Sequence, residues 1–143
     1  MERIFEGRRF HFIAGLLIAI TISLVYSNTF NASFHFDDTP HIVENYTIRN
    51  LNNLPSLLKG QRGVAIATFA INYAIGGLNV VGYHIVNIAI HIINSILVYF
   101  LIFITIRYFP CDNKRCDDIW PKKIAIYAAL LFAVHPIQTQ AVT

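Results

Sequence analysis

The chain has 143 residues, of which 55% are hydrophobic and only 13% are charged, about half the charged share of soluble domains. This composition argues against an ordinary soluble domain, and the high apolar content excludes a disordered chain. Seven glycines and two cysteines exclude collagen-like and disulfide-scaffold proteins, while the formal net charge of +3 gains meaning only from where the charges lie.

The first apolar segment covers residues 10–26 and contains no Asp, Glu, Lys or Arg. As a helix it would rise about 26 Å, which is short for a bilayer span, although residues 27–30 can extend it. Residues 1–9 resemble the basic start of a secretory signal, but no small-residue cleavage site follows. We therefore predict a retained transmembrane helix over 10–27, after a cytoplasmic N-terminus at 1–9.

A second uncharged segment, Val64–Val81, is an alternative span. Only Gly82 would then separate it from the next apolar helix, and the basic residues beyond that helix would lie outside, against the positive-inside tendency. We favour an extracytoplasmic loop over 28–82 that carries an interfacial helix near 64–76. The apolar face of this helix would consist of Ile66, Phe69, Ala70 and Tyr73.

The strongest predicted span is 83–106, which is uncharged apart from two histidines and would rise about 36 Å as a helix. A loop at 107–123 follows. The apolar run 124–134 is too short to cross alone, so we predict a third helix over 124–143 with a kink near 135–136. The sequence therefore predicts an all-α membrane protein with about three transmembrane helices and a long loop carrying short interfacial helices.

The basic residues predict the orientation. With the N-terminus inside, eight of the 11 Lys and Arg residues lie on the cytoplasmic side, and the outer loop holds only Arg49, Lys59 and Arg62. Cys111 and Cys116 then lie in a reducing compartment. Their spacing is a weak zinc signal, so we interpret them as ordinary loop thiols and predict no metal site there.

The stretch from Phe34 to His41 is the first candidate for chemistry, because Asp37 and Asp38 are adjacent and flanked by aromatic residues. Neighbouring carboxylates raise the pKa of one of them, which suits a general base or a cation site. The alternative is an exposed turn followed by a helix capped at Thr39, with Pro40 at its first position.

The second candidate is a polar stripe on the 83–106 helix. At 100° per residue its members fall within about 80° of arc, so we expect them to face protein or a cavity rather than lipid. Packing through hydrogen bonds is the favoured interpretation over a metal site, because the two histidines lie two turns apart. The stripe consists of His84, Asn87, His91 and Asn94, with Ser95 beside it.

Many short motifs follow one another along the chain. They are Phe36-Asp37-Asp38, Ile42-Val43-Glu44-Asn45, Arg62, Thr68-Phe69, Asn72-Tyr73, Gly77-Leu78, Gly82-Tyr83-His84, Asn87, His91, Asn94 and the final run from Phe132 to Val142, which contains His135-Pro136. In order and spacing they resemble the N-terminal membrane region of the transmembrane and tetratricopeptide-repeat O-mannosyltransferase family and its bacterial relatives. These belong to the GT-C class of polyprenyl-phosphate-dependent glycosyltransferases. The resemblance covers nearly the whole chain.

The resemblance implies a GT-C-like helical bundle that uses a polyprenyl-phosphate sugar donor at the extracytoplasmic or lumenal face. Asp37 and Asp38 match the family's acidic motif, where a carboxylate would orient or deprotonate the acceptor hydroxyl. Arg62 matches a loop arginine, which would pair with the lipid phosphate. The implied partners are the bilayer, the lipid-linked sugar, and a protein acceptor or other membrane subunits, with no nucleic acid. A divalent-metal requirement is left open.

His84, His91 and His135 are further candidates for binding the substrate or the lipid phosphate, and His135 belongs to the family's His-Pro motif. The chain departs from the family pattern at two positions. Gln140 stands where a Glu is often found, and Gly63 stands where many members have Pro. The first change removes an acid from the last motif, which leaves the role of that position in doubt.

The resemblance also implies a multi-pass protein of the bacterial inner membrane or the endoplasmic reticulum, with a cytoplasmic N-terminus. GT-C enzymes have many more spans, and the sequence stops at Thr143, inside the last motif. We therefore expect these residues to be the N-terminal part of a larger enzyme and to be inactive alone. The alternative is a truncated, non-enzymatic relative that packs into a larger complex as a membrane subunit.

Overall fold

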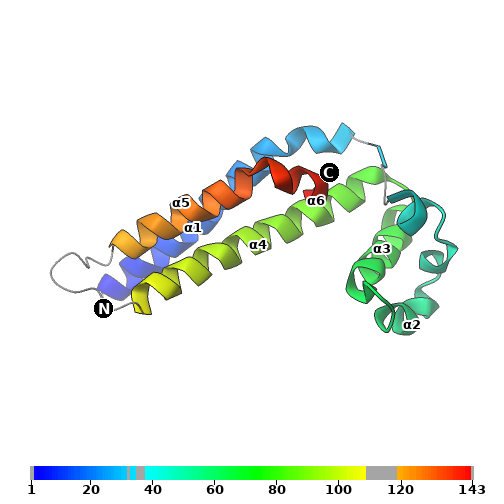
Figure 1. The fold of residues 1–143 in the computed structure, drawn as a ribbon, viewed down its shortest axis with the longest axis horizontal. Coiled ribbons are helices and arrows are strands. Elements are labelled where there is room, and N and C mark those ends of the chain that lie inside the picture. Colours follow the sequence, from blue (N-terminus) through cyan, green and yellow to red (C-terminus); the bar gives the residue numbers. More distant parts are fainter. Residues whose placement is uncertain (1, 32, 35–37, 109–118, 143) are drawn as a thin grey trace. The chain divides into compact units, whose positions relative to one another are not determined.

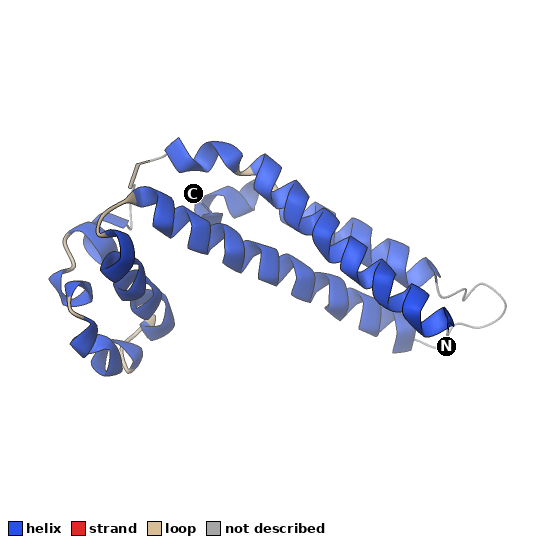
Figure 2. Ribbon diagram, turned by 180° about the vertical axis from the view of Figure 1, so that it is seen from behind, coloured by secondary structure: helices blue, strands red, loops and turns tan. Residues whose placement is uncertain are grey.

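The structure is a computed structural model that describes residues 2–31, 33–34, 38–108 and 119–142. Helices and the loops between them account for these residues (Figures 1 and 2), so the fold class is all-α as predicted. The chain divides into two compact units, one formed by residues 1–27 with 87–143 and the other by residues 28–86.

The first unit is a bundle of three long helices. It contains α1 (Glu2–Val25), most of α4 (Val80–Tyr108), α5 (Ile119–Val134), η5 (Pro136–Gln138) and α6 (Thr139–Val142). The Lys122 ammonium lies 5.4 Å from the centre of the Phe10 ring, and the Tyr26 hydroxyl reaches the Ala133 carbonyl, so α1 and α5 run parallel. α4 runs antiparallel to both (Figure 1). The basic start of α5 and the end of α4 therefore lie at the N-terminal end of α1.

Small and β-branched side chains at a spacing of four residues build the core of this bundle. A spacing of four places side chains on one helical face, and alanine lets two backbones approach closely. The buried residues of α1 are Ala14, Ile18 and Ile22, with Tyr26 just beyond its end, and those of α5 are Ala125, Ala129 and Ala133. On α4 the buried residues form a seam along the helix, which consists of Ile88, His91, Ser95, Tyr99 and Phe103.

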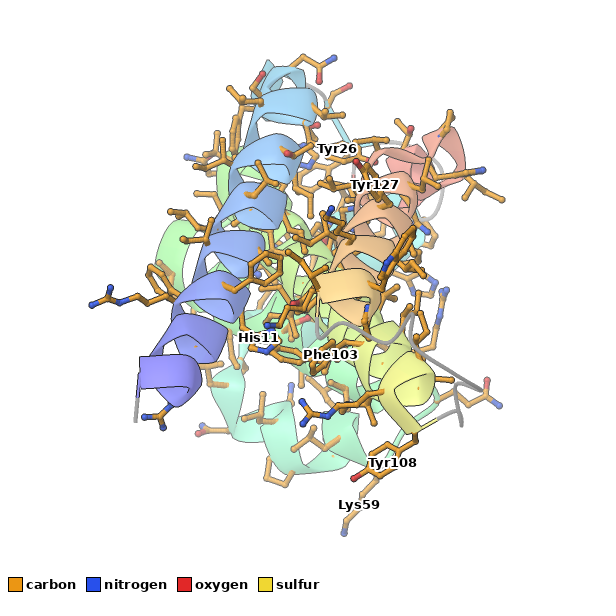
Figure 3. All side chains as sticks on the ribbon, turned by 90° about the vertical axis from the view of Figure 1, so that its left-hand side faces the viewer. His11, Tyr26, Lys59, Phe103, Tyr108 and Tyr127 are labelled. Atoms are coloured by element: carbon orange, nitrogen blue, oxygen red, sulfur yellow. The ribbon has the colours of Figure 1, made fainter. Side chains whose placement is uncertain are left out.

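An aromatic cluster closes the bundle at the N-terminal end of α1. The His11 ring lies 4.8 Å from that of Phe103, between centroids, and Figure 3 shows the two side chains against each other. The His11 Nδ1 atom is 2.7 Å from the Tyr99 hydroxyl. This contact satisfies polar atoms of α1 and α4 that would otherwise lie unbonded among apolar side chains.

The second unit consists of α3 (Gly63–Gly76) and several short helices. The short helices are η1 (Ser27–Asn31, shared with the first unit), η2 (Thr39–Val43), η3 (Tyr46–Arg49), η4 (Leu51–Asn53) and α2 (Leu54–Leu58). Of these, α2, η3 and η4 contact α3. Ile42, Ile48, Ala70 and Tyr83 form the buried core, with Ile66, Phe69 and Tyr73 packed against it. The four residues predicted for the apolar face of α3 therefore lie in or against this core.

Two helices are long and apolar enough to cross a membrane among the described residues, α1 from Arg8 to Val25 and α4 over its whole length. Only 17% of the most apolar stretch of α1 and 22% of that of α4 are buried within the chain. The core helices of a soluble protein are mostly buried. Phe12 and Leu24 on α1 and Leu101 on α4 are each at least 66% exposed. Such extended apolar surface is rare on soluble monomers, and it defines a membrane protein. The third predicted span, 124–143, is divided in the structure into α5, η5 and α6, and α5 has 16 residues. α5 is not among the described helices that are long and apolar enough to cross a membrane.

Candidate functional site

The predicted acidic motif leads into η2. Asp38 precedes this helix as its N-cap residue and is half-buried, with Pro40 in the first turn. Asp37 lies outside the described residues. The short helix that the alternative interpretation predicted is therefore present, but it begins at Thr39, and Asp38, not Thr39, precedes it as the N-cap residue.

Arg62 has an unusual backbone. It is the non-glycine residue with a positive φ, at 58°, within the part of the chain that the structure describes. This left-handed conformation lies immediately before α3, where Gly63 packs against the carbonyl oxygens of Leu57 and Leu58. A sparsely populated conformation of a non-glycine residue persists only when its surroundings impose it. Here the close packing of Gly63 on α2 imposes it.

The Arg62 guanidinium meets His41, a residue to which the sequence assigned no role. Its Nη1 atom lies 3.2 Å from the His41 Nε2 atom. Arginine has only donors, so the histidine nitrogen accepts and its proton lies on Nδ1. The contact joins η2 to the start of α3 across 21 residues, and it brings Arg62 to the helix that follows the acidic motif.

Arg49, another basic residue of the same unit, is engaged differently. Its guanidinium lies 4.2 Å from the centre of the Tyr46 ring and donates to the Val43 carbonyl at 3.1 Å. These contacts stabilise the loop. Arg49 is thus held by contacts within its own loop, whereas Arg62 contacts a side chain of η2.

The buried histidines of α4 do not face solvent. His84 is 3% exposed and belongs to the second unit, where the neighbouring Tyr83 hydroxyl donates to the Gly77 carbonyl at 3.0 Å. His91 is 4% exposed and belongs to the first unit. Its Nε2 atom lies 3.0 Å from the Ala133 carbonyl oxygen, so this nitrogen carries a proton and donates it.

Two members of the predicted polar stripe lie outside the buried seam. Asn87 is half-buried and Asn94 is exposed. Within the described residues Asn94 lies at the edge of the buried seam, because the seam steps by four residues from His91 to Ser95. The buried part of the stripe is therefore narrower than the predicted stripe. That Asn94 faces protein or a cavity stays a prediction.

His135 lies at the end of α5 and is exposed. Its Nδ1 atom accepts a hydrogen bond from the Ile137 N–H at 3.2 Å, which caps η5. The second ring nitrogen, Nε2, therefore carries the proton of the neutral ring.

The candidate residues fall in the two units. Asp38, Arg62 and His84 belong to the second, and His91 and His135 to the first. Over the described ranges, no group of three or more His, Cys, Asp or Glu side chains is arranged to hold a metal ion. The loop with Cys111 and Cys116 lies outside these ranges.

The fold and the exposed apolar helices define an all-α membrane protein. No family model matches the chain, and no solved structure matches it. Protein O-mannosyl-transferase Tmtc1 of Drosophila melanogaster is 30% identical over 147 residues, which cover 91% of this chain and 16% of the relative.

Two further relatives give the same result. Protein O-mannosyl-transferase F38B6.6 of Caenorhabditis elegans is 30% identical over 96% of this chain and 21% of its own length. Protein O-mannosyl-transferase TMTC4 of Homo sapiens is 31% identical over 92% of this chain and 20% of its own length. The chain is therefore a homologue of the transmembrane and tetratricopeptide-repeat family of O-mannosyl-transferases, as its motifs implied. It spans about a fifth or less of the length of these relatives.

Proposed function

We propose that the chain is part of a membrane glycosyltransferase of the GT-C type, which moves a sugar from a polyprenyl-phosphate donor to a hydroxyl group of a protein Ser or Thr. One observation carries this proposal. Relatives named protein O-mannosyl-transferases share about 30% identity with roughly nine tenths of the chain. The exposed apolar helices support a reaction at a membrane, where a lipid-linked donor resides.

The acidic motif supplies the base in this proposal. The acceptor oxygen attacks the anomeric carbon, and the bond from that carbon to the phosphate oxygen breaks. The acceptor proton passes to a carboxylate, for which we propose Asp37, with Asp38 supporting it at the start of η2. A positioned general base contributes a factor on the order of 10²–10⁴ to such a step.

Arg62 supplies the charge that the departing lipid phosphate requires. Negative charge develops on the phosphate as the glycosidic bond forms, and a fixed guanidinium stabilises it through charge-assisted hydrogen bonds. The contact with His41 and the imposed backbone conformation both limit the movement of Arg62 before the donor binds. Independently of Arg62, His135 of the first unit is proposed to bind the lipid-linked donor through its Nε2 atom.

The proposed topology has the N-terminus in the cytoplasm and residues 28–82 on the extracytoplasmic or lumenal side. Arg107 lies near Phe103 and Lys122 lies near Phe10, so both basic residues are at the end of the first unit where α1 begins. A shared cytoplasmic face requires this arrangement. The chain would then be an integral, multi-pass membrane protein whose long loop meets the lipid-linked sugar outside.

A transfer assay with matched charge variants tests the proposal. Membranes containing the complete protein receive a radiolabelled polyprenyl-phosphate mannose and a Ser- and Thr-rich acceptor protein. Arg62→Gln removes the phosphate contact and should lower transfer by about 10²-fold, the usual cost of losing one stabilising donor. Lys59→Gln removes the same charge three residues away, from an exposed side chain that extends from the ribbon (Figure 3), and should leave transfer unchanged. Equal losses in both variants would contradict a specific role for Arg62.

A further inference from the structure

The end of α5 leaves backbone carbonyl groups without their usual helical partners. Pro136 has no N–H, so the Phe132 carbonyl accepts only a long bond of 3.4 Å from the His135 N–H. The Ile137 N–H, which would bond the Ala133 carbonyl in a continuing helix, bonds the His135 ring instead. The Ala133 carbonyl therefore needs another donor, because residue 133 is fully buried.

Side chains from the other two long helices supply that donor. The His91 Nε2 atom of α4 lies 3.0 Å from the Ala133 oxygen, and the Tyr26 hydroxyl beyond α1 lies 3.4 Å from it. His91 and Tyr26 are both at least 96% buried, and their rings meet edge to face at 5.5 Å. One carbonyl thus ties three chain segments together at the point where α5 ends.

The surroundings of His91 fix the direction of its ring. The Phe132 ring lies 5.7 Å from it, between ring centroids, and the Tyr26 ring meets it edge to face. The ring therefore directs Nε2 at the Ala133 carbonyl and is too buried to reach a ligand in solvent. This position differs from the binding role that the sequence suggested for His91.

We propose that His91 is a positioning residue for His135. By bonding the Ala133 carbonyl it holds the last turn of α5, and this turn sets where the His135 ring presents its outward Nε2 donor. The inference rests on the proposed function for its ligand, an anionic phosphate oxygen of the lipid donor. Tyr26 supports the same carbonyl through its longer bond.

Three variants of the complete protein separate the hydrogen bond from the packing. His91→Phe keeps an aromatic ring between Tyr26 and Phe132 but removes the donor. His91→Gln loses the ring but keeps an N–H group at nearly the reach of Nε2. Ser95→Ala is the matched control, because its buried hydroxyl lies one turn away on the same seam and donates to the His91 carbonyl of its own helix.

Two measurements follow each variant. Hydrogen exchange of the peptide covering residues 135–139 should accelerate on the order of tenfold in His91→Phe, the effect of one lost hydrogen bond, and should stay near normal in Ser95→Ala. In the transfer assay, kcat/KM for the lipid donor should fall at least tenfold in His91→Phe, with KM for the acceptor protein unchanged. His91→Gln should restore part of both.

Unchanged exchange in His91→Phe would overturn the inference at once. Faster exchange with normal transfer would also overturn it, because the turn would then be held without any effect on the reaction. If the unaltered protein transfers no sugar from any lipid donor, the proposed function fails and the role of His91 in the reaction fails with it. The exchange measurement still decides separately whether His91 holds the turn.

Discussion

Gly63 decides the local geometry of the proposed phosphate-binding residue. A Cβ atom at this position would lie 2.4 Å from the Leu58 carbonyl oxygen and 2.8 Å from that of Leu57, far inside ordinary contact. The absence of a side chain thus lets α2 approach the start of α3, and the left-handed turn at Arg62 follows from this approach. One glycine therefore shapes the backbone that carries the guanidinium.

Gly63→Ala should destabilise the second unit by about 1–3 kcal/mol, the usual cost of overpacking against atoms that cannot move freely. Gly76→Ala is the control at the other end of α3. Its added Cβ would lie 3.8 Å from the nearest atom, so it should be neutral or stabilising by up to about 1 kcal/mol. The stability of both variants is measured by thermal unfolding in detergent, with protease sensitivity of the 28–86 segment as the readout. Equal stabilities of the two variants would contradict the account.

Sequence reasoning selected Arg62 through a family motif, but it gave no role to His41. The two residues are 21 positions apart and join two short elements, so no helical or strand periodicity relates them. His91 was selected as a polar residue of a membrane helix, and the expectation that it packs through a hydrogen bond agrees with the structure. Its partner is a backbone carbonyl on α5, and only the three-dimensional arrangement reveals that.

At the scale of elements, the alanines of α5 set how closely the helices of the first unit pack. Ala125, Ala129 and Ala133 are fully buried and recur every four residues. In a membrane, packing of this kind replaces the hydrophobic effect as the main force between helices. The sequence predicted this helix from its apolar character, whereas the role of its small residues became clear from the packing with α1.

Ala129→Leu should weaken the bundle by about 1–3 kcal/mol, because the added methyl groups have no space between α1 and α5. Ala89→Leu adds the same atoms at an exposed position of α4 and should have little effect. Thermal unfolding of the purified protein in one detergent compares the two. A bundle that tolerates leucine at both positions would show that α5 does not pack closely.

At the scale of the whole molecule, composition and hydropathy were sufficient to predict the all-α membrane class. A protein with 13% charged residues cannot cover long apolar helices with polar surface, and α1 and α4 indeed expose theirs. The division into two units was not predicted, because it depends on which short helices pack on α3 rather than on any single segment. The orientation across the membrane stays a prediction from the basic residues.

The central claim is that the chain contributes the acidic motif of a lipid-dependent glycosyltransferase, and sugar transfer by the complete protein tests it most directly. Radiolabelled mannose from a polyprenyl-phosphate donor should appear on an acceptor protein, and Asp37→Asn, which keeps the shape but removes the base, should abolish transfer with normal expression and membrane insertion. Glu44→Gln removes an exposed carboxylate seven residues farther along the chain and should leave transfer intact. Near-normal transfer by Asp37→Asn, or none by the unaltered protein, would contradict the account.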